Sequence, residues 1–218
     1  MNPESSLDAD LADRLAELER TGLRRTLRGV ERGRGAEVRV DGRSAIDFSS
    51  NDYLGLAADP RIARAAAQAL EEAGTGAGAA RLISGNHPFH ERLEREIAAF
   101  KGADAALLFP SGYAANTGAI PALAGRGDAL YSDALNHASL IDGCRLSRAE
   151  LRVFPHGDVD ALHHMLRDDA GRFARRMIVV DGVFSMDGDL FPLDRLVELA
   201  RTHDAWTYVD DAHGTGVL

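Results

Sequence analysis

The chain has 218 residues, enough for one large domain or two small ones, and its apolar (45%) and charged (27%) fractions are ordinary for a folded globular protein. Its net charge of -9 argues against a nucleic-acid or anionic-membrane partner. No apolar run approaches the roughly 18 residues of a membrane span, and the N-terminus lacks the apolar core of a secretory signal. The single cysteine, Cys144, cannot form an internal disulfide. For these reasons we expect a cytoplasmic protein.

The first expected element is an amphipathic helix that Gly22 is placed to end. Leucine recurs at helical spacing, at Leu7, Leu11, Leu15 and Leu18. Asp41-Gly42 then predicts a β-hairpin with a type I′ turn, because extended runs flank two residues that tolerate positive φ. We expect residues 1–50 to form this arm helix and hairpin, and residues 51–218 to form one larger domain.

From Asp59-Pro60 onward the pattern predicts regular alternation of helices and strands, beginning with a helix to about Ala73. Residues 74–81 (GTGAGAAR) form a loop without the third glycine of the dinucleotide fingerprint, which argues against a Rossmann dehydrogenase. Further helices are expected at 87–100, 112 onward, 137–146, 158–167 and 192–203, and strands at 105–109, 129–132, 151–154, 177–180 and 206–210. This alternation predicts an α/β fold, a mostly parallel sheet with helices on both faces.

Polar motifs follow several of the expected strands, and the carboxyl ends of parallel strands meet at one edge of a sheet. The terminal strand leads into DDAHGTG, which places Asp210, Asp211 and His213 at that edge. A carboxylate and an imidazole there suit pyridoxal phosphate, because they can bind its pyridine nitrogen and its phenolic oxygen. A capped strand end with solvated acids is an equally good interpretation of this motif alone.

The string FPSGYAAN combines a strand, a tight turn and a helix start. Ser111 can cap the helix, and the N–H groups of Gly112, Tyr113 and Ala114 can hold an anion such as a phosphate. The Tyr113 ring can also lie along an aromatic cofactor. An ordinary helix cap explains the same string without any ligand.

Two further loops carry candidate residues. His137 can stack on a planar cofactor, or it can simply cap the helix that follows it. Ser185 lies in DGVFSMDGD, where its hydroxyl can bind a cofactor oxygen or phosphate. The acids Asp181, Asp187 and Asp189 do not have the spacing of an EF-hand loop, so we expect no metal site there.

Six strings in register resemble the α-oxoamine synthases, which are pyridoxal-phosphate enzymes of the aspartate-aminotransferase fold (fold type I). The strings are FSSNDYLGL, SGNHPFHERLEREIAAF, LLFPSGYAAN, SDALNHASLIDGCRLS, DGVFSMDGD and VDDAHGTGVL. The resemblance extends over about residues 20–218. It implies the large, cofactor-binding domain of that fold.

The resemblance implies catalytic roles for three residues. Asp210 matches the carboxylate on the pyridine nitrogen, His213 the imidazole near the phenolic oxygen, and His137 the residue stacked on the ring. Further cofactor-binding positions are matched by Gly112, Tyr113 and Ser185.

The resemblance also implies the substrates and the assembly. Asn51 and His137 match residues near the amino-acid substrate, and Arg25, with Arg24 as the alternative, matches an arginine that contacts the acyl substrate. The implied reaction condenses L-alanine with a pimeloyl thioester of coenzyme A or acyl carrier protein, with loss of CO2, in biotin synthesis. Glycine C-acetyltransferase is the alternative, but it typically has DDSHAVG where this chain has DDAHGTG. A homodimer is expected, with residues 74–85 near the partner.

The family's Schiff-base lysine lies beyond the last motif, and this chain reaches only Leu218. Lys101 is the single lysine, and its position after a helix is typical of a solvated side chain. The resemblance therefore covers a large domain without its C-terminal part and without the small domain. We expect the 218-residue chain to be inactive alone. A catalytically dead binding or regulatory module that kept the cofactor pocket is the alternative from another class.

Overall fold

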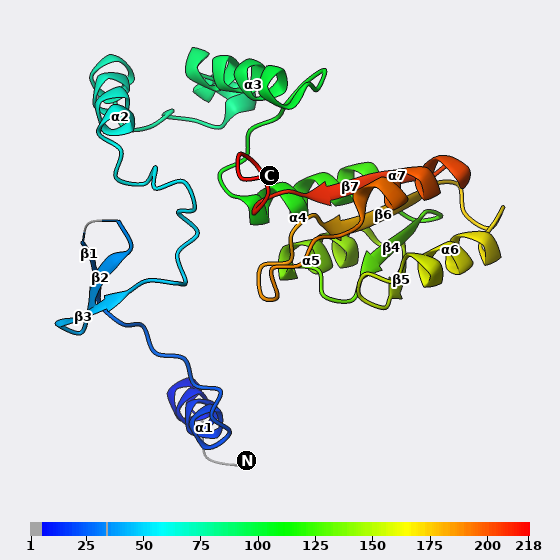
Figure 1. Ribbon diagram of the computed structural model, residues 1–218, viewed down its shortest axis with the longest axis horizontal. Helices are drawn as coiled ribbons and strands as arrows, with labels where there is room; N and C mark the ends of the chain where they lie inside the picture. The colour runs from blue at the N-terminus through cyan, green and yellow to red at the C-terminus, as the bar shows by residue number, and fades with distance from the viewer. Residues whose placement is uncertain (1–5, 34) are drawn as a thin grey trace. The chain divides into compact units, whose positions relative to one another are not determined.

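The computed structural model describes residues 6–33 and 35–218, and the chain divides into two compact units, Met1–Asp59 and Pro60–Leu218 (Figure 1). The first unit contains helix α1 (Leu7–Arg20) and a three-stranded antiparallel sheet. The strands of this sheet are β1 (Val30–Arg32), β2 (Glu37–Val40) and β3 (Arg43–Ile46).

The arm helix and the hairpin of the first unit are confirmed. Ser6 caps α1 by accepting a hydrogen bond from the Ala9 N–H (3.3 Å), and Gly22 follows at φ 69°. Asp41 and Gly42 both have positive φ (50° and 79°), as a type I′ turn requires. Strand β1 was not predicted, because three residues are too few to show alternation. The boundary after residue 50 stays a prediction.

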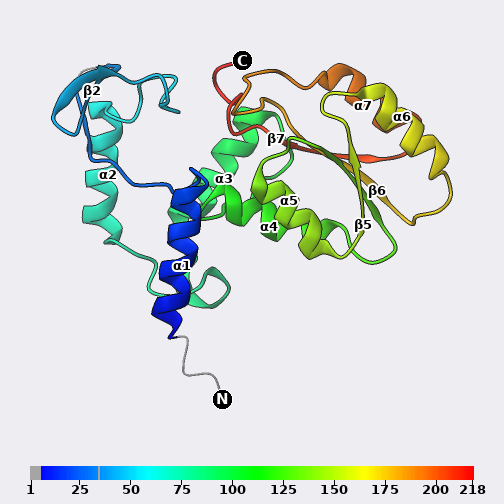
Figure 2. The same cartoon turned by 90° about the horizontal axis from the view of Figure 1, so that it is seen from below.

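The second unit is a layered α/β structure whose four strands are all parallel, in the order β5-β4-β6-β7. The strands are β4 (Ala129–Asp133), β5 (Glu150–Phe154), β6 (Arg176–Asp181) and β7 (Trp206–Asp210). The helices are α2 (Pro60–Ala73), α3 (Pro88–Lys101), α4 (Gly112–Leu123), α5 (Ala138–Ser147), α6 (Val159–Asp168) and α7 (Leu193–Thr202), with a single π-helical turn η1 (Arg81–Gly85). Figure 2 shows the sheet between α4 and α5 on one side and α6 and α7 on the other.

Alternation along the buried strands produces two separate cores. On β4, Leu130 faces α4 and α5, whereas Tyr131 faces α6 and α7, because successive side chains point to opposite faces of a sheet. Both are fully buried, as are Ile178 and Val179 on β6. Each such apolar side chain contributes about 1.5–3 kcal/mol by burial, so helices on both faces are needed to stabilise the sheet.

Cys144 belongs to the core beneath α4 and α5 and is fully buried. Burial raises the pKa of its thiol to about 11, because the thiolate would lose its hydration there. Cys144 is therefore a packing residue, as expected for a lone cysteine on a helix.

The strand predicted at 105–109 is wrong. This segment has no regular secondary structure and belongs to neither sheet of the described chain, and Leu107 is 69% exposed. The Leu108 N–H donates to Glu94 Oε1 (2.8 Å), and the Arg81 guanidinium holds the same carboxylate (2.6 Å). The hydrogen bond from Arg81 and that from Leu108 lower the pKa of Glu94 to about 2. The Glu94 side chain of α3 thus accepts a backbone hydrogen bond that a neighbouring strand would otherwise accept.

The parallel arrangement brings the carboxyl ends of all four strands to one edge of the sheet. The loops that follow β4, β5, β6 and β7 start from this edge. None of the helices in the described ranges is both long enough and apolar enough to cross a lipid bilayer.

Candidate active site

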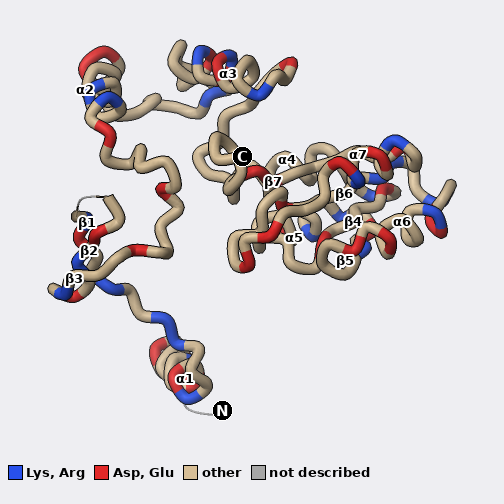
Figure 3. Tube along the Cα trace, in the orientation of Figure 1, with Lys and Arg blue, Asp and Glu red and all other residues tan. Residues whose placement is uncertain are grey.

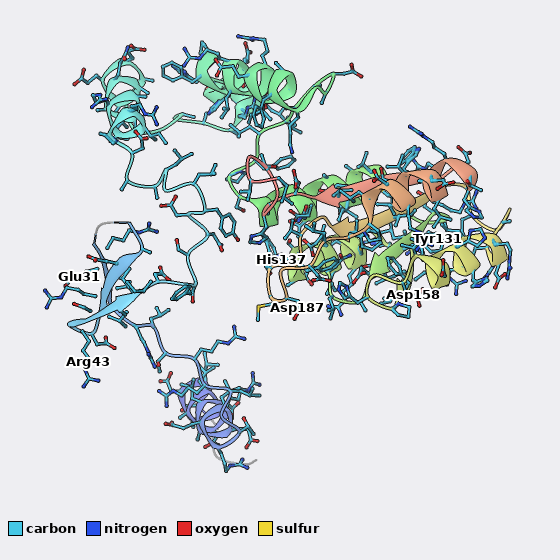
Figure 4. All side chains as sticks on the ribbon, viewed as in Figure 1. Glu31, Arg43, Tyr131, His137, Asp158 and Asp187 are labelled. Atoms are coloured by element: carbon cyan, nitrogen blue, oxygen red, sulfur yellow. The ribbon has the colours of Figure 1, made fainter. Side chains whose placement is uncertain are left out.

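Two carboxylates stand side by side at the carboxyl edge of the sheet. Asp181 ends β6 and Asp210 ends β7, and the two residues are paired in register. Figure 3 shows further acidic positions along the loops at this end of the unit, and Figure 4 labels His137 beside the loop that carries Asp187. Parallel pairing therefore brings the motifs that end β6 and β7 together at this edge.

Asn116 of α4 is 5% exposed and forms hydrogen bonds with several residues of the site. Its Nδ2 donates to Asp210 Oδ2 (2.7 Å) and to Ser139 Oγ (2.9 Å), while its Oδ1 accepts from the Tyr208 hydroxyl (2.8 Å). Burial raises the pKa of Tyr208, and the charge of Asp210 adds to the effect, so the phenol stays a donor. The amide therefore has partners on both sides and fixes the orientation of the Asp210 carboxylate.

His137 is joined to the same network through Ser139. Its Nδ1 lies 2.7 Å from Ser139 Oγ and accepts from the Ser139 N–H (3.2 Å), which assigns the hydrogen of a neutral ring to Nε2. Its own backbone N–H donates to Asp181 Oδ2 (2.7 Å). The imidazole is thus fixed at one edge while the ring remains exposed. An exposed, oriented ring of this kind can stack on a planar ligand.

Asp181 is only 7% exposed, and its pKa is raised. Burial is the largest cause and the charge of Asp210 adds to it, whereas the His137 N–H and the charges of His137 and His213 oppose it. His213 therefore lies close enough for its charge to affect the Asp181 carboxylate. The structure brings together His137, Asp181, Asp210 and His213.

The Lys101 side chain is 42% exposed, as predicted, and it also forms an ion pair with the turn after β7. Lys101 Nζ lies 2.5 Å from Asp211 Oδ2, and the Thr215 hydroxyl donates to the same oxygen (2.7 Å). A Cβ on Gly214 would lie 2.2 Å from Asp211 Oδ1, so a larger residue there would require the Asp211 carboxylate to shift. The ion pair therefore connects the end of α3 to the turn that carries His213.

Ser111 caps α4 as predicted, and this changes which N–H groups can bind an anion. Its Oγ accepts from the Ala114 N–H (3.1 Å), so this donor is already used and was wrongly counted among the anion-binding groups. The Tyr113 hydroxyl donates to Asp142 Oδ2 (2.6 Å), which raises the pKa of Tyr113, and its ring is half exposed. Gly112 begins the helix.

No hydrogen bond described here connects the other predicted residues, Ser185, Arg25 and Asn51, to this network. Ser185 is exposed in the turn after Phe184. Arg25 and Asn51 are exposed residues of the unit Met1–Asp59, and Asn51 Oδ1 accepts from the Tyr53 hydroxyl (3.4 Å). The roles of all three stay predictions.

Asn116 and Ser139 are not among the site residues expected from the sequence motifs. Asn116 lies on the buried face of α4, four residues before the fully buried Ile120. A polar side chain on the buried face of a helix indicates a hydrogen-bond partner, because an unpaired buried amide is costly. That signal could have identified Asn116, whereas its partner, 94 residues away, could not be read locally.

Comparison with known proteins agrees with this geometry. The family described as Aminotransferase class I and II matches residues 43–218. An 8-amino-7-oxononanoate synthase of Geobacter sulfurreducens is 54% identical over 208 residues, 95% of this chain and 53% of that protein. One from Burkholderia mallei is 53% identical over 222 residues, 100% of this chain and 55% of that protein. The chain spans about half the length of these curated relatives.

Solved structures show the same fold. A serine palmitoyltransferase of Sphingomonas wittichii aligns with a TM-score of 0.81 and 35% identity, covering 96% of this chain and 52% of that one. An 8-amino-7-oxononanoate synthase of Francisella tularensis aligns with a TM-score of 0.63 and 28% identity, covering 75% and 44%. The predicted fold class is therefore confirmed, and the chain belongs to the aminotransferase class I and II family.

Proposed function

We propose that this chain is the cofactor-binding part of a pyridoxal-phosphate-dependent 8-amino-7-oxononanoate synthase. The observation that carries the proposal is the hydrogen-bonded series from Asp210 through Asn116 and Ser139 to His137 at the carboxyl edge of the sheet. Relatives of that name at 53–54% identity support it. The proposed reaction condenses L-alanine with a pimeloyl thioester in biotin synthesis, with loss of CO2.

The residues of this edge fit the cofactor. Asp210 accepts hydrogen bonds from Asn116 Nδ2 (2.7 Å) and from the Ala212 N–H (3.0 Å), both uncharged donors. Its negative charge is thus oriented without being paired by these contacts, and it suits a protonated ring nitrogen. The exposed ring of His137 supplies a flat surface next to it.

When bound, pyridoxal phosphate supplies a protonated pyridine ring that accepts electron density from the α-carbon of the amino acid. Asp210 holds the proton on the ring nitrogen, and His137 supports the ring face. Gly112 and Tyr113 present N–H groups at the start of α4 to the phosphate. Further proposed contacts to the cofactor come from Ser185 and His213.

Substrate binding is proposed for Arg25, Asn51 and His137. Arg25 offers a guanidinium to the acyl substrate. Asn51 offers a hydrogen bond to the carboxylate of the amino acid, and His137 helps to position that substrate. We propose that the functional protein is a homodimer and that its acyl donor is carried by coenzyme A or by acyl carrier protein.

A substrate comparison tests this function. The protein expressed from its complete gene is incubated with pyridoxal phosphate and one of three substrate pairs, and release of the free thiol is followed. The pairs are L-alanine with pimeloyl-coenzyme A, glycine with acetyl-coenzyme A, and L-serine with palmitoyl-coenzyme A; pimeloyl-acyl carrier protein is then compared with pimeloyl-coenzyme A.

We expect kcat/KM for L-alanine and a pimeloyl donor to exceed those for the other pairs by at least about 100-fold, because a missing or ill-fitting substrate group costs a few kcal/mol. A preference for glycine and acetyl-coenzyme A would overturn the proposal. Binding of pyridoxal phosphate without turnover of any pair would instead favour a non-catalytic module.

A further inference from the structure

His156 lies in the loop between β5 and α6 and contacts a carboxylate through each ring nitrogen. Its Nδ1 is 2.9 Å from Asp133 Oδ1, and its Nε2 is 2.6 Å from Asp189 Oδ2. The two acids come from different loops, Asp133 from the end of β4 and Asp189 from the loop after β6. None of the motifs discussed above accounts for this bridge.

The surroundings of Asp133 decide the protonation of His156. The Asp133 side chain is fully buried and also accepts the N–H groups of Leu135 and Gly157 (2.8 Å each), so both of its oxygens act as acceptors. Nδ1 must then donate to Asp133, and Nε2 must donate to Asp189. A ring that donates through both nitrogens is an imidazolium.

The electrostatic balance agrees with this assignment. Burial lowers the pKa of His156, but the hydrogen bonds and charges of Asp133 and Asp189 outweigh burial, so the pKa is raised above its ordinary value of 6.5. These two carboxylates, from the two elements packed against the ring, are the charged groups that act on it.

On one side, His156 holds both ends of the loop that carries Ser185. The Phe184 N–H donates to the Asp189 carbonyl (3.0 Å), which closes the loop, and the Gly188 N–H donates to the Phe184 carbonyl (2.7 Å). The His156 ring packs edge-to-face against the Phe184 ring, with 4.3 Å between the ring centroids, and it also binds the Asp189 side chain. Ser185 lies between these two anchored residues.

On the other side, His156 is connected to the turn that carries His137. Asp133 accepts from the Leu135 N–H, and its carbonyl accepts from the Asn136 N–H (3.3 Å), so the carboxylate that binds His156 also shapes the turn before His137. One charged ring thus joins two loops of the candidate site.

We propose that His156, as an imidazolium between Asp133 and Asp189, is a positioning residue that fixes the Ser185 loop to the turn carrying His137. Its relevance to cofactor binding rests on the proposed function, whereas the restraint on the loop does not. Loss of either hydrogen bond releases the loop and leaves the sheet intact.

Hydrogen exchange in the full-length protein tests the restraint. Asp189→Asn removes the charge at the exposed end of the bridge, and His156→Gln removes the ring. Asp187→Asn is the matched control, because Asp187 is exposed in the same loop and its loss of charge is identical. We expect residues 184–189 to exchange at least about tenfold faster in the first two variants and within about twofold of wild type in the control.

Two further readouts separate positioning from general destabilisation. The double variant is expected to exchange no faster than either single variant, because both break one bridge. Nitrogen NMR is expected to show both His156 nitrogens protonated at pH 6. The proposal is overturned if Asp189→Asn behaves like Asp187→Asn, or if the ring is neutral.

Cofactor affinity distinguishes this inference from the proposed function. We expect both bridge variants to bind pyridoxal phosphate at least about tenfold more weakly than the control. If the loop loosens while affinity is unchanged, the restraint is supported and the assignment of Ser185 to the cofactor fails.

Discussion

Acids at the two edges of the same sheet have different hydrogen-bond partners. At the amino edge, Asp128 and Asp169 are neutralised by arginine: Arg175 binds Asp128 (2.9 Å) and Arg152 binds Asp169 (3.0 Å). At the carboxyl edge, Asp181 and Asp210 accept hydrogen bonds from backbone and amide N–H groups. Arginine compensates the charge of the acids at the amino edge, whereas at the carboxyl edge the donors to Asp210 are neutral and leave its charge for a ligand.

The strongest test of this contrast is Asp210→Asn. We expect kcat/KM to fall by about 1000-fold with little change in Tm, because the orientation by Asn116 is kept while the charge on the ring nitrogen is lost. Kinetics of the full-length protein with L-alanine and a pimeloyl thioester measure the effect. Asp187→Asn is the control, and equal activity of the two variants would contradict the assignment of Asp210.

At the other edge, Asp169→Ala is expected to destabilise the fold. It removes the partner of the buried Tyr131 hydroxyl (3.0 Å) and of Arg152, which leaves buried polar groups unpaired. Urea unfolding should show a loss of about 2–4 kcal/mol. Asp168→Ala, next to it and exposed, should change stability by less than about 0.5 kcal/mol. A change of similar size in both variants would remove the distinction.

Substitution of Asn116 should affect both properties to a smaller degree. Asn116→Leu removes the donor to Asp210 and Ser139 and leaves the Tyr208 hydroxyl without its acceptor. We expect a 10- to 100-fold fall in cofactor affinity, of about the size found for partners that orient ligand-binding side chains. Fluorescence titration with pyridoxal phosphate measures it. An unchanged affinity would show that Asp210 needs no orienting amide.

The smallest effect expected is a pH dependence from His156. Because its folded pKa is raised above the ordinary 6.5, its contribution is complete below about that pH and is lost as pH rises through the folded pKa. With the ring side chain 26% exposed, we expect a loss of a few tenths to about 1 kcal/mol. Unfolding free energies compared across this range should show the loss in wild type and not in His156→Gln.

The layers of the fold could be predicted because their signals are local. A few residues are enough to predict the strand conformation of the buried run Met177–Val180 and the turn at Asp41-Gly42. The segment 105–109 has the same apolar character but was wrongly predicted, because a strand also needs a neighbour. Local composition cannot show whether that neighbour is present.

The candidate site was predicted only in its outline. The motifs at His137 and Asp210 lie at the carboxyl ends of β4 and β7, so parallel pairing alone brings them to one edge. Their connection through Asn116 and the bridge at His156 depend on contacts between residues that are far apart in sequence. Such contacts follow from how helices pack on the sheet, which no short stretch of sequence encodes.

The inaccessibility of the one thiol has a practical consequence. Because Cys144 is fully buried and its pKa is raised to about 11, maleimide reagents at neutral pH should leave it unmodified. A cysteine introduced at Met186, which is 91% exposed in the Ser185 loop, would then be the sole reactive position among the described residues. A fluorophore attached there could report movement of that loop without first removing the native sulfhydryl.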